Sequence, residues 1–323
     1  MEMEMETKKI IKHLRAYNPY CEHITLATIF AKIKIKNSRF NVLNHGPPGT
    51  GKSYGSIELI EKLDLGSEII LDNNTTKRGL FETFLNYPNH DIILDECSAL
   101  VRDRGAQDMI KLAAEGKALN WVKKDSVEKS KPFGGNIILN VNSSLMDSLS
   151  DRFFVNVTLM NRKMASDYVD HYLDKKVEAE KEFLKFIRRR IQAKKDPELT
   201  TSELIHIRTF VKKQIELNDE NLGYSRRVIQ RMLAYFKRVK KFFGRLDDEV
   251  LLFIEPYAAA YIENRRTPTI IETLLGDEKL EKPALIKLLA RETGYSERHA
   301  RRLVDEELIK GKLKLFGRVV SVT

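Results

Sequence analysis

The sequence predicts an α/β fold in which helices cover both faces of a mostly parallel β-sheet. Five short apolar runs have the length and composition of buried strands, and helical stretches such as residues 77–85 and 107–114 separate them. Strands that alternate with helices along a chain are typical of a parallel sheet covered on both faces. The five runs are residues 40–45, 67–73, 91–96, 135–142 and 153–159.

A glycine-rich loop, "HGPPGTGKSYG" at residues 45–55, follows the first predicted strand and precedes a helical stretch. It fits the pattern G-x-x-x-x-G-K-[ST], in which backbone N–H groups and the positive end of the next helix bind phosphates. Lysine in this pattern reaches the terminal phosphates, and the serine hydroxyl ligates Mg²⁺. We therefore expect ATP and Mg²⁺ as cofactors, held by Gly46, Pro47, Pro48, Gly49, Thr50, Gly51, Lys52, Ser53 and Tyr54.

The third predicted strand ends in two acidic residues, Asp95 and Glu96. Buried parallel strands bring such carboxylates to the carboxyl edge of the sheet, beside the phosphates. We expect Asp95 to be the second magnesium residue with Ser53, usually acting through water. Glu96 is expected to polarise the attacking water. A solvated turn is the alternative reading of this pair.

The runs "GPPGTGKS", "IILDE" and "IILNVN" together resemble the AAA+ ATPases. The resemblance implies that Asn142, or else Asn140, is the sensor 1 residue that orients the attacking water. "LSDRFF" resembles the stretch that carries an arginine finger, which makes Arg152 the candidate and Arg102 and Arg104 lesser ones. Such a finger acts on the nucleotide of a neighbouring subunit, so the resemblance implies a homo-oligomeric ring, expected to be a hexamer.

"GYSRRVIQRML", at residues 223–233, resembles the lid helix that carries sensor 2. The resemblance implies that Arg226 or Arg227 faces the γ-phosphate; an ion pair at the surface is the alternative. Residues 221–246 contain no acidic residue, and their basic residues are expected to share the surface of one helix, where they could bind phosphates. Val228, Met232 and Tyr235 belong to its expected buried stripe.

A polar insertion with four lysines precedes the fourth strand: "LNWVKKDSVEKSKPFGGN". It resembles the β-hairpin of superfamily 3 helicases and of related AAA+ proteins of viruses and plasmids. That resemblance implies contacts with a DNA backbone; a solvated loop is the alternative. The lysines are Lys123, Lys124, Lys129 and Lys131.

The C-terminal segment looks like a winged helix-turn-helix, with a hairpin around Phe316 and Gly317 as the wing. Ala300, Leu303, Val304 and Leu308 are expected to face inward on its second helix. Recognition helices present their N-terminal residues to DNA; docking to another protein is the alternative. The candidate DNA contacts are Arg298, His299, Arg301, Arg302 and Arg318.

These features divide the chain into four expected parts. Residues 1–37 form an N-terminal helical segment, 38–163 the α/β nucleotide-binding core, 164–247 a helical lid and 248–323 a C-terminal helical and winged-helix domain.

Composition agrees with a folded protein that binds a polyanion. The 323 residues are 42% hydrophobic and carry a formal net charge of +10, which suits DNA, although solubility alone is the alternative. No apolar run is long enough to predict a membrane span. The acidic start lacks the apolar core of a secretory signal. With two cysteines, Cys21 and Cys97, these features lead us to expect a cytoplasmic protein.

We therefore expect an ATP-hydrolysing oligomer that acts on DNA, as a replication helicase or as an initiator or helicase loader with other replication proteins as partners. One alternative is a sequence-specific DNA-binding regulator whose oligomeric state ATP switches. The other is an ATPase that remodels proteins. An ATPase of DNA transposition or segregation is a further alternative, because such proteins share the same predicted core.

Overall fold

A computed structural model describes most of the chain. The described residues are 7–18, 21–46, 48–122, 126–142, 149, 152–158, 177–217, 225–263, 275, 279–293, 296–309, 313–317 and 319–322. The chain forms two compact units, which are Met1–Val141 with Leu145–Arg265, and Asn142–Ser144 with Arg266–Thr323.

A five-stranded, fully parallel sheet forms the centre of the first unit, in the order β2-β3-β6-β1-β7. This confirms the predicted α/β class. Each predicted strand is present, and each of its ends lies within two residues of the expected position, because uninterrupted apolar runs suit the strands of a covered parallel sheet. The strands are β1 (Val42–His45), β2 (Glu68–Leu71), β3 (Asp91–Leu94), β6 (Ile137–Val141) and β7 (Phe154–Val157).

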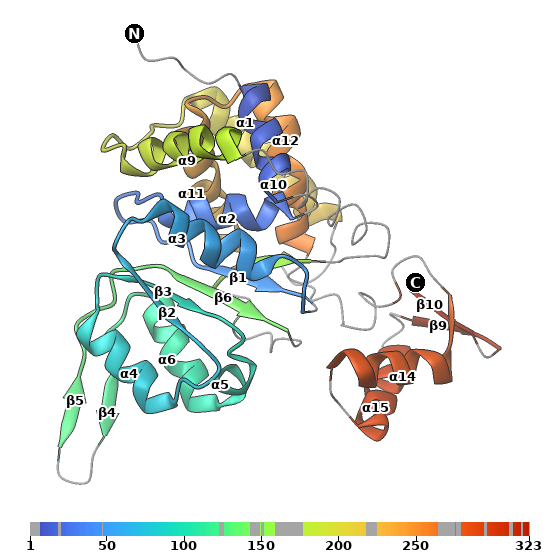
Figure 1. Ribbon diagram of the computed structural model, residues 1–323. Helices are drawn as coiled ribbons and strands as arrows, with labels where there is room; N and C mark the ends of the chain where they lie inside the picture. The colour runs from blue at the N-terminus through green and yellow to red at the C-terminus, as the bar shows by residue number, and fades with distance from the viewer. Residues whose placement is uncertain are drawn as a thin grey trace. The chain divides into compact units, whose positions relative to one another are not determined.

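Helices pack on both faces of this sheet, and alternate strand residues enter two different cores (Figure 1). Leu43, Ile92 and Leu139 pack with α4 (Lys77–Asn86), α5 (Ser98–Arg102) and α6 (Arg104–Ala114). Side-chain caps begin two of these helices. Thr76 accepts from the Gly79 N–H at 3.0 Å, and Asp103 accepts from the Ala106 N–H at 2.7 Å.

A larger helical layer covers the opposite face, where Val42, Ile93 and Ile138 enter its core. It combines N-terminal helices with helices from the middle of the chain (Figure 1). The first unit continues beyond residue 247 to Arg265. The helices are α1 (Thr7–Tyr17), α2 (Glu22–Lys32), a π-helical turn (Tyr54–Glu58) leading into α3 (Leu59–Leu63), α9 (Val177–Gln192), α10 (Thr201–Leu217), α11 (Ser225–Phe243) and α12 (Asp248–Glu263).

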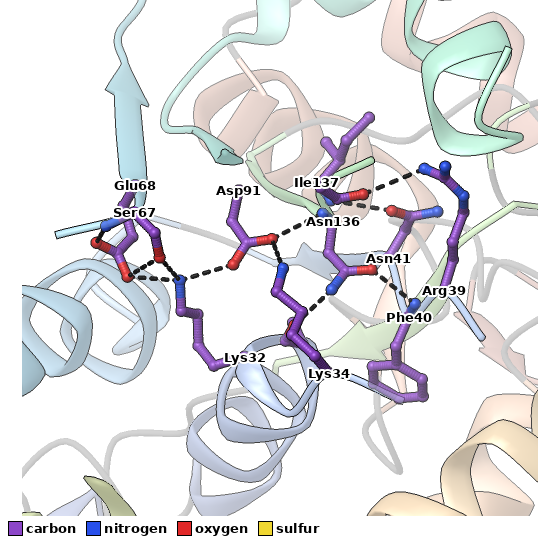
Figure 2. Close-up of polar contacts among 12 residues, drawn as sticks. Lys32, Lys34, Arg39, Phe40, Asn41, Ser67, Glu68, Asp91, Asn136 and Ile137 are labelled. Atoms are coloured by element: carbon purple, nitrogen blue, oxygen red, sulfur yellow. Dashed lines mark hydrogen bonds and ion pairs between the residues drawn. The ribbon is translucent and has the colours of Figure 1, made fainter. Parts of the chain in front are cut away.

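A buried charge network joins α2 to the amino edge of the sheet (Figure 2). Lys32, only 2% exposed, lies 2.5 Å from a Glu68 oxygen and 2.7 Å from an Asp91 oxygen. Asp91 also pairs with Lys34 and accepts from the Asn136 N–H at 2.8 Å. Every charge in the network has an opposite charge beside it, which is the condition under which ions are tolerated in a core.

Basic residues of α11 do not all lie at the surface, so that expectation is wrong. Arg238 is fully buried and donates to the carbonyl oxygens of Phe30, Ala234 and Ser38 at 2.7–3.0 Å. Lys241 is 7% exposed and donates to the Lys34 carbonyl oxygen at 2.8 Å. Helical periodicity places these residues on the polar side of the helix, but the N-terminal segment folds over that side. The buried stripe through Val228, Met232 and Tyr235 is confirmed.

The insertion before β6 forms the expected hairpin, with β4 (Asn120–Val122) antiparallel to β5 (Val127–Lys129). Figure 1 shows it extending beyond α4 and α6. Trp121 anchors its base, since the ring lies 5.5 Å from Phe81 and the Arg78 guanidinium lies 5.2 Å from it. Arg78 also pairs with Glu128 at 2.7 Å.

Among the described residues of the second unit, eight are buried in a small separate core, including Leu285, Val304 and Val320. Its helices are α14 (Lys282–Thr293) and α15 (Glu297–Ile309), and its antiparallel sheet has the order β8-β10-β9. The strands are β8 (Leu280–Glu281), β9 (Leu313–Phe316) and β10 (Val319–Val322). The expected hairpin around Gly317 is therefore present, and the four predicted inward residues of α15 pack into this core.

Among the helices that the structure describes, none combines the length and the hydropathy needed to cross a bilayer.

Candidate nucleotide-binding site

The phosphate loop lies at the carboxyl edge of the sheet, directly after β1. After β1 the chain crosses to β2 at one edge of the sheet. After β6, which neighbours β1, it crosses in the opposite direction to β7 at the other edge. Open α/β sheets bind their ligands outside the strand ends at such a change of direction. β3 and β6 run parallel to β1, so their carboxyl ends reach the same edge.

Two glycines allow the loop to take its path. Gly51 has φ 75°, a left-handed conformation that other residues adopt only with strain. Gly46 lies so close to Thr158 at the end of β7 that a Cβ atom would clash with the threonine side chain. The Thr158 hydroxyl in turn lies 2.7 Å from the Thr50 hydroxyl. Substitution at either glycine would therefore displace the loop.

The N-terminal helices also hold the loop. Cys21 donates its thiol proton to the Thr50 carbonyl oxygen at 3.0 Å. Burial raises the pKa of this thiol to about 12, so it stays protonated and keeps that hydrogen bond. Tyr54, expected to contact nucleotide, stacks on Tyr17 of α1 at 5.2 Å between ring centroids. The structure thus gives Tyr54 a packing role at the start of the loop helix.

Lys52 is 5% exposed and points back into the loop, where its ammonium donates to the Gly46 carbonyl oxygen at 2.8 Å. Burial lowers the pKa of this ammonium to about 8, although Asp95 and Glu96 act to raise it. The ammonium also donates to the Thr50 hydroxyl at 3.4 Å. A cation held by the oxygens of the loop itself is placed to neutralise a phosphate that enters the loop.

Ser53 and Asp95, the two expected magnesium residues, are brought together. The Ser53 hydroxyl donates to both Asp95 oxygens, at 3.0 and 3.1 Å. Hydroxyl and carboxylate oxygens are the donors that Mg²⁺ takes, with few ligands from protein and the rest from water and phosphates. Ser53 is exposed and Asp95 is half-buried, so both reach solvent. The pair therefore fits a magnesium ion.

Glu96 is exposed and has φ 51°, one of three left-handed conformations found among the described non-glycine residues. This conformation costs an L-residue roughly 1–2 kcal/mol. Strained residues of this kind gather at functional sites, where the surrounding structure holds them. Glu96 directly follows Asp95, so the strain lies next to the Ser53–Asp95 pair.

Asn140 contacts this pair. Its side-chain amide donates to Asp95 Oδ1 at 2.9 Å and to Ser56 Oγ at 2.8 Å. Asn142, the first sensor 1 candidate, lies one residue beyond β6 and is half-buried. The geometry therefore favours the alternative, Asn140, as the residue coupled to the site.

Two further asparagines, Asn44 in β1 and Asn156 in β7, belong to the site although they were not predicted. Asn44 donates to Asn140 Oδ1 at 2.9 Å, and Asn156 donates to Asn44 Oδ1 at 2.9 Å. Asparagine is depleted in strands, so its presence near the carboxyl ends of three buried strands was the available signal.

Arg152 lies at the opposite, amino edge of the sheet, two residues before β7 begins. Its Nε and Nη2 lie 2.7 and 2.6 Å from Glu115 Oε1, just after α6. The two residues line a cavity of about 200 Å³, together with Arg39 and Arg231. Arg102 and Arg104, the lesser finger candidates, are exposed around the junction of α5 and α6.

Five of the expected DNA contacts lie among the described side chains, and all five are exposed: Lys129, Lys131, Arg298, Arg301 and Arg302. The two lysines follow the hairpin tip, and the three arginines lie on the first turns of α15. Pro47, Lys123, Lys124 and Arg318 lie outside the described residues, as do the side chains of Arg226, Arg227 and His299.

A scan against models of known protein families finds no match, and a search of curated proteins finds none either.

Proposed function

We propose that this chain is a magnesium-dependent ATPase of the AAA+ type. One observation carries the proposal, namely the contact between Ser53 of the loop and Asp95 after β3, at the carboxyl edge of a parallel sheet. A phosphate loop and a strand-end carboxylate that meet through oxygen ligands form a site for a nucleotide and its metal ion. The resemblance of "GPPGTGKS" and "IILDE" to AAA+ sequences supports the same assignment.

The described residues divide the chemistry among themselves. The loop N–H groups and Lys52 bind the phosphates, and Ser53 and Asp95 would hold Mg²⁺, which supplies charge neutralisation at the phosphates. Glu96 accepts a proton from the attacking water. Its carboxylate is exposed, so a water molecule can reach it. In this scheme Asn140 holds Asp95 in place, because both protons of its amide are donated within the site.

Arg152 completes the site of a neighbouring subunit in this proposal. The four residues of β7 separate it from the carboxyl edge by more than about 10 Å, at roughly 3.3 Å per residue. It is therefore too far from the loop of its own chain to contact the same phosphates. An arginine at the far edge of the sheet suits a ring or filament in which each subunit serves the next.

In this proposal the oligomer acts on DNA and uses ATP hydrolysis to move along it or to assemble on it. Exposed arginines on the first turns of α15 suit a recognition helix, and α14, α15 and the β9–β10 hairpin suit a winged helix. Helices α9, α10 and α11 would serve as the lid. The cellular role that follows is replication, as a helicase or as an initiator or loader.

The test compares ATP hydrolysis and oligomer size with and without duplex, single-stranded and forked DNA. We expect DNA to change one of them, and Arg298→Ala with Arg301→Ala to weaken DNA binding and lower its salt dependence. Arg208→Ala is the control at an exposed arginine of α10 that is not among the proposed DNA contacts, and its DNA affinity should equal that of the wild type. If neither the hydrolysis rate nor the oligomer size changes with any form of DNA, the proposed role in replication is wrong.

A protein-remodelling ATPase is the second candidate, and the hairpin favours it. Val122 and Val127 pair across β4 and β5, yet they are 75% and 61% exposed. Two exposed valines suit contact with an unfolded polypeptide better than contact with a phosphate backbone. Stimulation of hydrolysis by an unfolded protein such as casein, but not by DNA, would select this candidate. Val122→Ser with Val127→Ser should then abolish the stimulation.

A further inference from the structure

Three buried asparagines lie side by side on adjacent strands of the sheet. Asn44 of β1 is the register partner of both Asn140 of β6 and Asn156 of β7. Their exposed fractions are 0%, 1% and 4%. A buried amide is stable only where its hydrogen bonds are made, so the three side chains depend on one another.

All three face the same side of the sheet as Asp95. Side chains two positions apart share a face of a strand, and the residues two positions before the four polar ones all belong to the core under the larger helical layer. Those residues are Val42, Ile93, Ile138 and Phe154. Leu94 is the register partner of Leu139, so the next residue, Asp95, lies beside Asn140. The polar row thus crosses β7, β1, β6 and the end of β3.

The hydrogen bonds of this row have one direction. Asn156 Nδ2 donates to Asn44 Oδ1, Asn44 Nδ2 donates to Asn140 Oδ1, and Asn140 Nδ2 donates to Asp95 Oδ1, each at 2.9 Å. An ionised carboxylate accepts but never donates. Asp95 therefore requires the NH₂ group of Asn140, which turns the Asn140 oxygen towards Asn44. The same requirement then passes from Asn44 to Asn156.

The second proton of the Asn140 amide is also used. It is donated to Ser56 Oγ at 2.8 Å, and the Ser56 hydroxyl donates to the Lys52 carbonyl oxygen at 2.7 Å. Asn140 is thus fixed on one side by the helix after the phosphate loop and on the other by Asn44. Aligned hydrogen bonds in a low dielectric strengthen one another, so the row acts as one rigid unit.

We propose that Asn156, Asn44 and Asn140 form an amide ladder that positions the Asp95 carboxylate for the magnesium–nucleotide complex. The proposal rests on the function proposed above and adds two positioning residues, Asn44 and Asn156, that act on Asp95 only through Asn140. From Asn156 to Asp95 the row spans three strand spacings, about 14 Å at roughly 4.8 Å each. Partners of metal ligands typically change metal affinity or activity by about 10–100-fold when they are replaced.

The test measures the affinity of a fluorescent ATP analogue with Mg²⁺ and with a chelator, and the hydrolysis rate, for Asn140→Leu, Asn44→Leu and Asn156→Leu. We expect the affinity in chelator to stay within about twofold of wild type. The additional affinity from Mg²⁺ should fall by at least about tenfold in Asn140→Leu and Asn44→Leu. It should fall less in Asn156→Leu, which leaves the donor to Asn140 in place.

Asn136→Leu is the matched control. Asn136 is equally buried, at 4% exposure, and donates to the Ala31 carbonyl oxygen at the amino edge. It should lower the midpoint of thermal unfolding about as much as the ladder variants, with the Mg²⁺ effect and the rate unchanged. If the leucine variants do not fold, Asn44→Ser and Asn156→Ser remove the amide with less change in polarity. The loss of Mg²⁺-dependent affinity should again be larger in the Asn44 variant than in the Asn156 variant.

The outcomes separate the two proposals. A wild-type protein that hydrolyses ATP with Mg²⁺, with ladder variants indistinguishable from Asn136→Leu, would overturn the ladder alone. A wild-type protein whose nucleotide affinity does not respond to Mg²⁺, and which does not hydrolyse ATP, would overturn the proposed function and the ladder with it.

Discussion

The Ser53 hydroxyl donates to the Asp95 carboxylate at 3.0 Å, across 42 residues of sequence. This contact joins the first turn after the phosphate loop to the end of β3. Three strands and a buried row of amides hold it in place.

Nucleotide affinity is expected to fall as pH rises above 8. Burial lowers the pKa of Lys52 to about 8, and a bound phosphate favours the protonated ammonium. Below pH 8 the cation is already present, whereas above it a proton must be taken up on binding. The Kd for ATP should rise about tenfold between pH 7.5 and pH 9.

Calorimetry in buffers of different ionisation enthalpy should detect that proton uptake at pH 9 and little of it at pH 7. The same proton count at both pH values would show that Lys52 does not titrate on binding. Lys52→Ala should abolish nucleotide binding, because it removes the ammonium that lies inside the loop beside the Gly46 carbonyl oxygen.

Replacement of Glu96 by glycine is expected to abolish hydrolysis without lowering the stability of the fold. Glu96→Gly should leave the free energy of unfolding unchanged or raise it by up to about 1 kcal/mol, because glycine relieves the left-handed strain. Hydrolysis should be lost, since the carboxylate is gone. Thermal unfolding and phosphate release measure the two effects.

Asp64→Gly is the matched control, because Asp64 is also exposed and left-handed, with φ 45° after α3. It should change stability in the same direction and leave hydrolysis intact. An active Glu96→Gly protein would remove Glu96 from the mechanism.

Arg152 is expected to act between subunits. Arg152→Ala and Lys52→Ala should each be inactive alone, the first through the site of its neighbour and the second through its own. Mixed oligomers contain some interfaces with an intact loop facing an intact arginine, so mixing should restore part of the hydrolysis rate. No recovery in oligomers shown to be mixed would contradict a finger at Arg152.

Asp91 is expected to matter for stability and not for chemistry. Burial alone would raise its pKa, but Lys32 and Lys34 outweigh burial and hold the pKa below its ordinary value of 3.8. Its ionised form thus stabilises the fold above that value, and the contribution is lost as pH falls from 3.8 through the lowered pKa.

Asp91→Asn leaves the buried Lys32 with Glu68 as its remaining carboxylate partner and should lower the free energy of unfolding by about 1.5–3 kcal/mol. Asp108→Asn is the control, because Asp108 is 69% exposed beside Lys111 and should cost less than about 1 kcal/mol. Chemical denaturation at pH 7 and pH 3.5 measures both. An Asp91→Asn protein as stable as Asp108→Asn at pH 7 would show that the network adds nothing.

The strand positions and the Ser53–Asp95 pairing were predictable from the sequence, because apolar runs and a spaced motif are local signals. Asn44 and Asn156 were not, since a single asparagine in an apolar strand has no evident partner until the strand register is known. Arg238 was wrongly placed at the surface for a related reason. Its partner Phe30 lies 208 residues away, and helical periodicity contains no information about such a contact.

The break between α1 and α2 was not predictable from the local sequence either. Residues 10–35 have apolar positions throughout, yet the chain turns where Asn18 donates to the Cys21 carbonyl oxygen at 3.2 Å. That turn places Cys21 against the phosphate loop, so a feature without a strong local signal helps to hold the site.

The most direct test of the central claim is a single-turnover measurement of phosphate release from radiolabelled ATP with Mg²⁺, using wild type and Glu96→Gln under conditions that saturate both. The expected result is that the two proteins bind ATP equally, that wild type releases phosphate, and that Glu96→Gln retains intact ATP with release slowed at least about a hundredfold. Equal release rates from the two proteins, or bound ATP that wild type never hydrolyses, would contradict it.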